Sequence, residues 1–97
     1  MKNAIIYVRG NNKEMQEVFC KLCAAEQGYN VLFATDDIKE VRNCDILLIS
    51  NPSRISRDNT KYYEVVNEFK AKGIEVVSVA HHDNSVDFYT FARELFK

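Results

Sequence analysis

Arginine residues gather in two short segments of a chain that is slightly acidic overall. Residues 7–12 contain Arg9, and residues 51–58 contain Arg54 and Arg57, which together are three of the five arginines in the sequence. The formal net charge is nevertheless −1. A guanidinium group presents a rigid fork of N–H donors that matches the oxygens of phosphate or carboxylate. The two segments therefore indicate either an anion-binding site or surface ion pairs with local acids.

Predicted strands and helices alternate along the chain, and each arginine segment follows a strand. Short apolar runs predict strands at residues 4–9, 31–34, 45–50 and 74–80. Apolar residues at helical spacing predict a helix over Lys13–Gln27, which Gly28 ends, and a second from a cap at Asp58 to Lys72. One or two helical turns are expected within residues 36–43, and a last helix at about 85–96.

This alternation predicts one α/β domain over residues 1–97, with three α/β/α layers around a mainly parallel four-stranded sheet in the order 2-1-3-4. Ligands of such sheets bind beyond the carboxyl ends of the strands, where the winding reverses. The loops after the first and third strands open there, so the three arginines are expected to share one crevice. Asp36 and Asp58 are the acidic residues expected nearest to them.

Length and composition are those of an ordinary globular domain, with 97 residues, 46% of them hydrophobic and 28% charged. The longest strictly apolar runs, Ile46–Ile49 among them, are far shorter than the ~20 residues of a membrane span, and the start does not resemble a signal peptide. We therefore expect a cytoplasmic protein without a membrane partner. A sequence pI of about 6.1 provides no general basic field for nucleic acid, so any anion binding must be local.

Two other groups of residues have spacings that need an explanation. Cys20 and Cys23 have the spacing of zinc and redox motifs, but they lie within a predicted helix without a second pair, so we expect structural residues. His81 and His82 follow the fourth strand, where neighbouring side chains point in opposite directions, which favours a plain loop. Neither a P-loop nor a dinucleotide fingerprint is present. We expect no metal and no cofactor.

The arginine segments resemble those of the serine recombinases, the resolvase/invertase family. Tyr7-Val8-Arg9 is similar to the family's Tyr-x-Arg-Val-Ser, and Arg54-Ile55-Ser56-Arg57-Asp58 to its Asp-Arg-Leu-Ser-Arg-Asp/Asn. The resemblance extends over nearly all of the chain. It implies a catalytic-type domain that acts on DNA phosphodiesters through a serine nucleophile, with Arg9, Arg54 and Arg57 as phosphate-binding residues and Gln16 as a supporting glutamine.

The sequence departs from the family pattern at the positions that carry the chemistry. Asn11 stands where the nucleophilic serine is expected, and an amide nitrogen cannot replace a hydroxyl because its lone pair is delocalised. Ser53 stands where the family has an aspartate before Arg54, and no arginine follows the second predicted strand before Arg42. The chain stops near the start of the family's long helix, so we expect no attached DNA-binding domain.

Three hypotheses follow. We favour a resolvase-like domain that keeps part of the phosphate site without the chemistry, binds the DNA backbone weakly, and has a homo-oligomer or a full-length recombinase as possible partner. The second hypothesis is a working recombinase fragment in which Ser53 or Ser56 replaces the nucleophile. The third is a non-enzymatic flavodoxin-like module that binds an anion or a protein.

Overall fold

The computed structural model describes residues 1–79, so the expected helix at 85–96 and the two histidines His81 and His82 lie outside the described residues. The elements follow one another in the predicted alternation. They are β1 (Asn3–Tyr7), α1 (Lys13–Gln27), β2 (Asn30–Thr35), the one-turn helix η1 (Ile38–Glu40), β3 (Ile46–Ile49), the one-turn helix η2 (Pro52–Arg54), α2 (Asn59–Ala71) and β4 (Glu75–Ser78).

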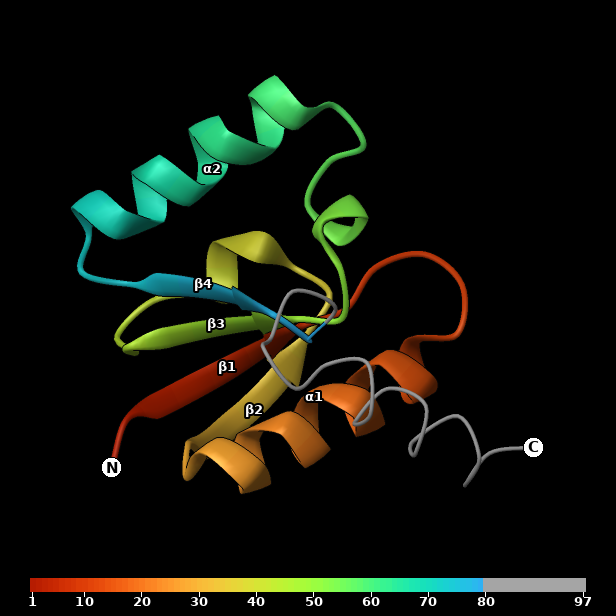
Figure 1. The fold of residues 1–97 in the computed structure, drawn as a ribbon, viewed down its shortest axis with the longest axis vertical. Helices are drawn as coiled ribbons and strands as arrows, with labels where there is room; N and C mark the ends of the chain where they lie inside the picture. Colours follow the sequence, from red (N-terminus) through yellow and green to blue (C-terminus); the bar gives the residue numbers. More distant parts are fainter. Residues whose placement is uncertain (80–97) are drawn as a thin grey trace.

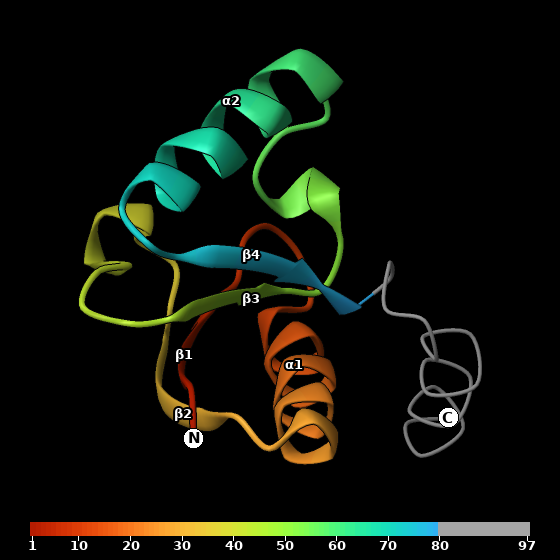
Figure 2. The same cartoon turned by 60° about the vertical axis from the view of Figure 1, so that its left-hand side comes forward.

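The four strands form one sheet in the order β2-β1-β3-β4, and all three pairings are parallel. The predicted order is therefore confirmed. Helix α1 covers one face of the sheet and α2 lies on the other, as Figures 1 and 2 show from two directions. The carboxyl ends of β1 and β3 lie at the same edge, from which the two arginine segments emerge.

Alternating side chains of the central strands supply the two cores. Ala4 and Ile6 of β1 pack with Cys20 and Cys23 of α1, whereas Ile5 packs on the opposite face with a cluster that includes residues of α2. Successive side chains of a strand point to opposite faces, so a strand covered on both sides reads as a continuous apolar run. All four residues of β3 are fully buried for the same reason.

The predicted helix ends are confirmed by their backbone contacts. Gly28 ends α1 in the left-handed conformation, at φ 76°, which glycine adopts without strain. The Asp58 carboxylate accepts hydrogen bonds from the backbone N–H groups of Thr60 and Lys61 and so caps α2. The first turn of α1 begins differently, because Asn12 is itself left-handed, at φ 60°, and its side chain makes no cap.

Three strands are shorter than predicted. The first ends at Tyr7, although the Val8 N–H still donates to the Thr35 carbonyl at 2.9 Å, and Arg9 has left the sheet.

The second 3₁₀ turn, η2, was not predicted, and it reverses the direction of the chain directly after β3. Its signal lies in Asn51-Pro52, since proline has the right φ for a first helical position and the Asn51 side chain accepts from the Ser53 N–H.

We expect Leu48→Ala to lower the free energy of unfolding by about 3–5 kcal/mol, because Leu48 is fully buried between the sheet and α1 and its truncation leaves a cavity. Leu32→Ala is the matched control, since Leu32 on the edge strand is 42% exposed and its loss should cost about 1 kcal/mol or less. Urea denaturation followed by circular dichroism measures both. Equal losses would contradict the assignment of the core.

Candidate anion-binding site

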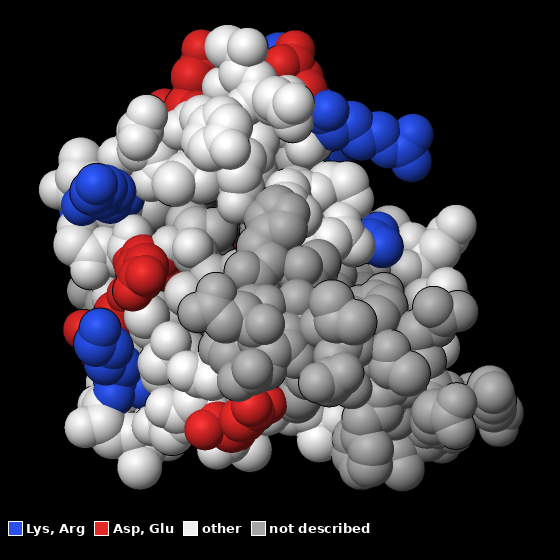
Figure 3. Space-filling view, viewed as in Figure 1, with Lys and Arg blue, Asp and Glu red and all other residues white. Residues whose placement is uncertain are grey.

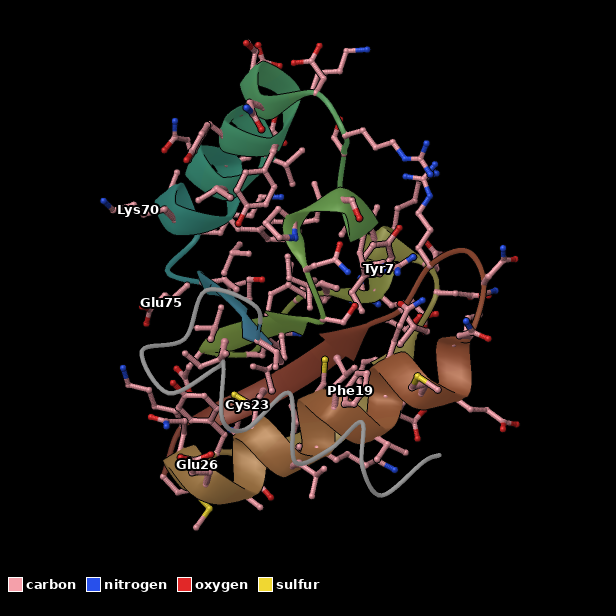
Figure 4. The ribbon with its side chains drawn as sticks, turned by 45° about the vertical axis from the view of Figure 1, so that its right-hand side comes forward. Tyr7, Phe19, Cys23, Glu26, Lys70 and Glu75 are labelled. Atoms are coloured by element: carbon pink, nitrogen blue, oxygen red, sulfur yellow. The ribbon has the colours of Figure 1, made fainter. Side chains whose placement is uncertain are left out.

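The three arginines line one hollow at the carboxyl ends of β1 and β3. Its volume is about 340 Å³, and its wall consists of Arg9, Gly10, Ser53, Arg54, Ile55, Ser56 and Arg57. In Figure 4, Tyr7 marks the carboxyl end of β1, and Lys70 and Glu75 mark the opposite end of the sheet. Two loops that are more than forty residues apart in sequence thus meet because their strands are neighbours in a parallel sheet.

Arg54 is held in place by two hydrogen bonds to neutral groups. Its Nε donates to the Ser50 hydroxyl at 3.3 Å, and its Nη1 donates to the backbone carbonyl of Arg9 at 3.0 Å. The side chain is half-buried and spans from the β3 loop to the β1 loop. Because neither acceptor carries a charge, the guanidinium keeps its positive charge uncompensated while its orientation is fixed.

Arg9 and Arg57 are exposed and more weakly held. The Arg9 Nη1 lies 3.5 Å from the Ile55 carbonyl, at the outer limit of a hydrogen bond. Within residues 1–79 no hydrogen bond or ion pair engages the Arg57 side chain. Both guanidinium groups are therefore available to a ligand.

The expected acidic neighbours do not neutralise the arginines. Asp36 instead pairs with Lys13 at 3.0 Å, and this hydrogen bond together with the lysine charge lowers the pKa of the Asp36 carboxyl. Asp58 caps α2, as described above. Neither of the two ion pairs among residues 1–79 contains an arginine. The alternative of surface ion pairs between these arginines and local acids such as Asp36 or Asp58 therefore finds no support in the described part of the chain.

Gln16 contacts the backbone of the β1 loop through both ends of its side-chain amide. It is a buried residue, 3% exposed, whose Oε1 accepts from the Arg9 N–H at 3.0 Å. Its Nε2 donates to the carbonyls of Arg9 and Asn11, both at 2.8 Å. All of its amide hydrogens are therefore used by the backbone of the β1 loop. Gln16 therefore positions this loop, and its support of a phosphate site stays a prediction.

Asn11 lies beside the arginine hollow and not in its wall. Together with Gly10 and the first turn of α1 it lines a neighbouring hollow of about 630 Å³. Gly10 separates the two, with a φ of +80°, and a Cβ at this position would lie 3.4 Å from the Arg54 Nη1. A side chain at Gly10 would therefore be strained by the positive φ and would contact the Arg54 guanidinium.

Two polar residues at the end of β3 belong to the site but were not predicted from the sequence. Ser50 receives the Arg54 Nε bond, and Asn51 shapes η2 through its side chain. Polar residues at the carboxyl end of a buried parallel strand were the available signal, since that edge is where such sheets place their ligands. The 3₁₀ turn η2 decides which of these polar residues contacts Arg54.

The cysteine pair Cys20 and Cys23 lies in the core in the described residues. Burial raises the pKa of the Cys20 and Cys23 thiols, so both stay protonated at neutral pH within the core. Residues 1–79 contain no group of three histidine, cysteine or acidic side chains that would hold a metal ion. The same residues include no helix with the length and apolar character needed to cross a membrane. A hollow of about 520 Å³ at the opposite end of the sheet has mixed charges, from Lys2, Asp45, Lys70 and Glu75.

Residues 33–96 match the family model described as the resolvase N-terminal domain, which covers about two thirds of the chain. The chain belongs to this family. The matched segment contains Arg54 and Arg57, whereas Arg9, Asn11 and Gln16 precede it. Among curated proteins no relative matches. The family membership confirms the resemblance and decides against a flavodoxin-like module of another family.

Solved structures of serine recombinases share the fold of this resolvase domain. The N-terminal catalytic domain of TP901-1 integrase superposes with a TM-score of 0.68 at 17% sequence identity, over 98% of this chain and 94% of that one. The C-terminal catalytic domain of ISC1926 TnpA, an IS607-like serine recombinase, gives 0.64 at 18% identity, over 94% of this chain and 79% of that one. At these identities the likeness concerns the fold alone.

We expect Gln16→Ala to lower the free energy of unfolding by about 1–3 kcal/mol, because it removes the partners of three backbone groups around a buried position. Gln27→Ala, an exposed change in the last turn of the same helix, should change it by about 0.5 kcal/mol or less. Thermal unfolding gives both values, and amide exchange at Arg9 should accelerate in the first variant only. An unchanged loop in Gln16→Ala would refute the positioning role.

Proposed function

We propose that this resolvase-family domain binds the phosphate backbone of DNA at the arginine hollow and does not cut or exchange strands. One observation carries the proposal. Three arginines from two loops line the same hollow, and in residues 1–79 none of them is paired with a carboxylate. Like charges gathered in this way favour an anion, and phosphate oxygens match the donor geometry of arginine.

The absence of strand transfer is proposed from what stands at the nucleophile position. The Asn11 side chain has no hydroxyl, and it borders the neighbouring hollow instead of the arginines. The serines that do line the arginine hollow are poor substitutes. The Ser53 hydroxyl donates to the Asn51 side-chain oxygen, and the Ser56 hydroxyl accepts from the Asp58 N–H at 3.1 Å. Neither contact supplies a general base that would activate an alcohol.

Weak affinity follows from the small number of charges. The sequence pI of about 6.1 adds no long-range attraction, so binding depends on the three arginines. A homo-oligomer or a full-length recombinase as partner would bring several such sites to one DNA and raise the effective concentration. We propose either as the partner and the cytoplasm as the compartment, in keeping with three free cysteines.

We expect the logarithm of the DNA affinity to fall with the logarithm of salt concentration with a slope of about −2.7, as for three neutralised phosphates. Arg57→Ala should reduce the size of this slope by about 0.9 without unfolding the protein, since Arg57 makes no hydrogen bond or ion pair within residues 1–79. Arg42→Ala is the matched control, because exposed Arg42 lines another hollow. Fluorescence anisotropy with labelled duplex DNA measures the slopes. Equal effects of the two variants would speak against the arginine hollow.

We expect neither the natural protein nor Asn11→Ser to form a covalent adduct with supercoiled DNA that carries candidate crossover sites. A restored hydroxyl would still lack the aspartate before Arg54 and the arginine that the family has after its second strand, and one missing donor in such a site typically costs about 10²–10³ in rate. Denaturing gel electrophoresis followed by mass spectrometry detects the adduct. A phosphoserine link in Asn11→Ser would mean that Asn11 alone blocks the chemistry, and one in the natural protein would overturn the proposal.

A further inference from the structure

We infer that the exposed face of β2 is a surface on which two copies of this chain associate about a two-fold axis. A homo-oligomer is one of the partners proposed above, and this surface gives it a place on the molecule. The surface is separate from the arginine hollow, so the inference does not depend on phosphate binding.

Strand β2 carries two large apolar side chains that the fold leaves uncovered. Leu32 and Phe33 are neighbours in sequence, and each is 42% exposed. Phe33 pairs with Ile5, whose side chain lies on the same side of the sheet as α2. Helix α2, however, lies along β4 at the other edge of the sheet, away from β2, as Figures 1 and 2 show. The apolar face of β2 is therefore open to a partner.

Strand β2 is also an edge strand without the usual protection against association. Such strands commonly carry a lysine or a proline, but Asn30–Thr35 contains no charged residue and no proline. Leu32 is the extra residue of a bulge, because the residues on either side of it pair with consecutive residues of β1. A bulge interrupts the regular ladder of free N–H and C=O groups. Contact through side chains in a closed pair is thus favoured over an open-ended extension of the sheet.

The rim of this apolar surface carries one charge of each sign. Glu40 and Arg42 lie in the wall of a hollow of about 270 Å³ that Leu32 and Phe33 also line. The Thr35 hydroxyl donates to the Glu40 Oε1 at 2.6 Å and so orients the carboxylate, whereas Arg42 is in no ion pair within residues 1–79. In a two-fold pair the same surface meets itself, which sets Arg42 against the partner's Glu40 twice. This self-complementary charge pattern favours a second copy of the chain as the occupant.

The overall charge does not oppose the pairing. A net charge of −1 means that two copies repel each other little. Acidic and basic side chains are interspersed along the left-hand side of the face in Figure 3, and they are not separated by sign. Long-range repulsion is therefore no barrier to the contact of two apolar surfaces.

The small size of the apolar surface predicts a weak dimer. Small interfaces belong to transient complexes, and we expect a dissociation constant of about 0.1 mM. At low micromolar concentration the chain is then mainly a monomer. Leu32→Ala and Arg42→Ala accordingly remain suitable controls in the unfolding and DNA measurements described above.

Sedimentation equilibrium of the full chain between about 10 µM and about 1 mM tests the inference. We expect a monomer–dimer equilibrium, and Phe33→Ser should raise its dissociation constant at least tenfold by removing apolar contact area. Tyr63→Ser is the matched control, because Tyr63 is a 62% exposed aromatic residue on α2 and its loss should leave the dimer unchanged. Circular dichroism checks that both variants fold.

Charge reversal tests the two-fold arrangement separately from folding. Arg42→Glu and Glu40→Arg should each weaken self-association about fivefold, since each sets like charges against one another. An equimolar mixture of these two variants should form a heterodimer at least as tight as the natural dimer, because every facing pair is then of opposite sign.

A monomer at all concentrations, or species that grow beyond a dimer, would overturn the inference and leave the phosphate site untouched. A dimer that Phe33→Ser does not weaken would place the contact elsewhere and would also overturn it. A dimer that depends on Phe33 but gains nothing in the mixture would contradict the facing of Arg42 and the partner's Glu40.

Discussion

The backbone carbonyl of Arg9 is the point on which the geometry of the site depends. It accepts one hydrogen bond from the Gln16 Nε2 at 2.8 Å and another from the Arg54 Nη1 at 3.0 Å. Gln16 belongs to α1 and Arg54 to the turn after β3, so this one oxygen connects a helix on one face of the sheet with the loop of a neighbouring strand. A carbonyl has two lone pairs, and both are used here. The β1 loop is thereby fixed against both of its neighbours.

This arrangement tolerates three positive charges because it keeps them near water. Arg9 and Arg57 are exposed and Arg54 is half-buried, so their repulsion is screened, whereas a fully buried cluster would carry a large desolvation cost. The neutral partners of Arg54 fix its direction without cancelling its charge. Orientation and charge are thus supplied by different groups, which allows the site to be preorganised and still attract an anion.

Family membership accounts for the fold, whereas the side chains at the site bear on whether the domain can carry out the chemistry. The resolvase family model matches residues 33–96, and the fold agrees with the catalytic domains of two serine recombinases. A shared fold positions loops at one edge of a sheet, but the chemistry depends on the side chains in those loops. In the proposed function, Asn11 and Ser53 stand where the resemblance places the family's serine and aspartate. The scaffold and the arginines are therefore compatible with phosphate binding without bond breaking.

The sequence by itself determined the sheet order, the bounds of α1 and the cap of α2, because apolar periodicity, Gly28 and Asp58 act within a few residues of where they stand. It also placed the three arginines at one edge, since parallel topology follows from alternation. Only the tertiary structure decided what each side chain contacts. Gln16 binds the loop backbone because it is buried beneath Arg9, and Asp36 pairs with Lys13 because β2 ends beside the start of α1. Such contacts join residues that are neighbours only after the chain has folded, so no local pattern in the sequence encodes them.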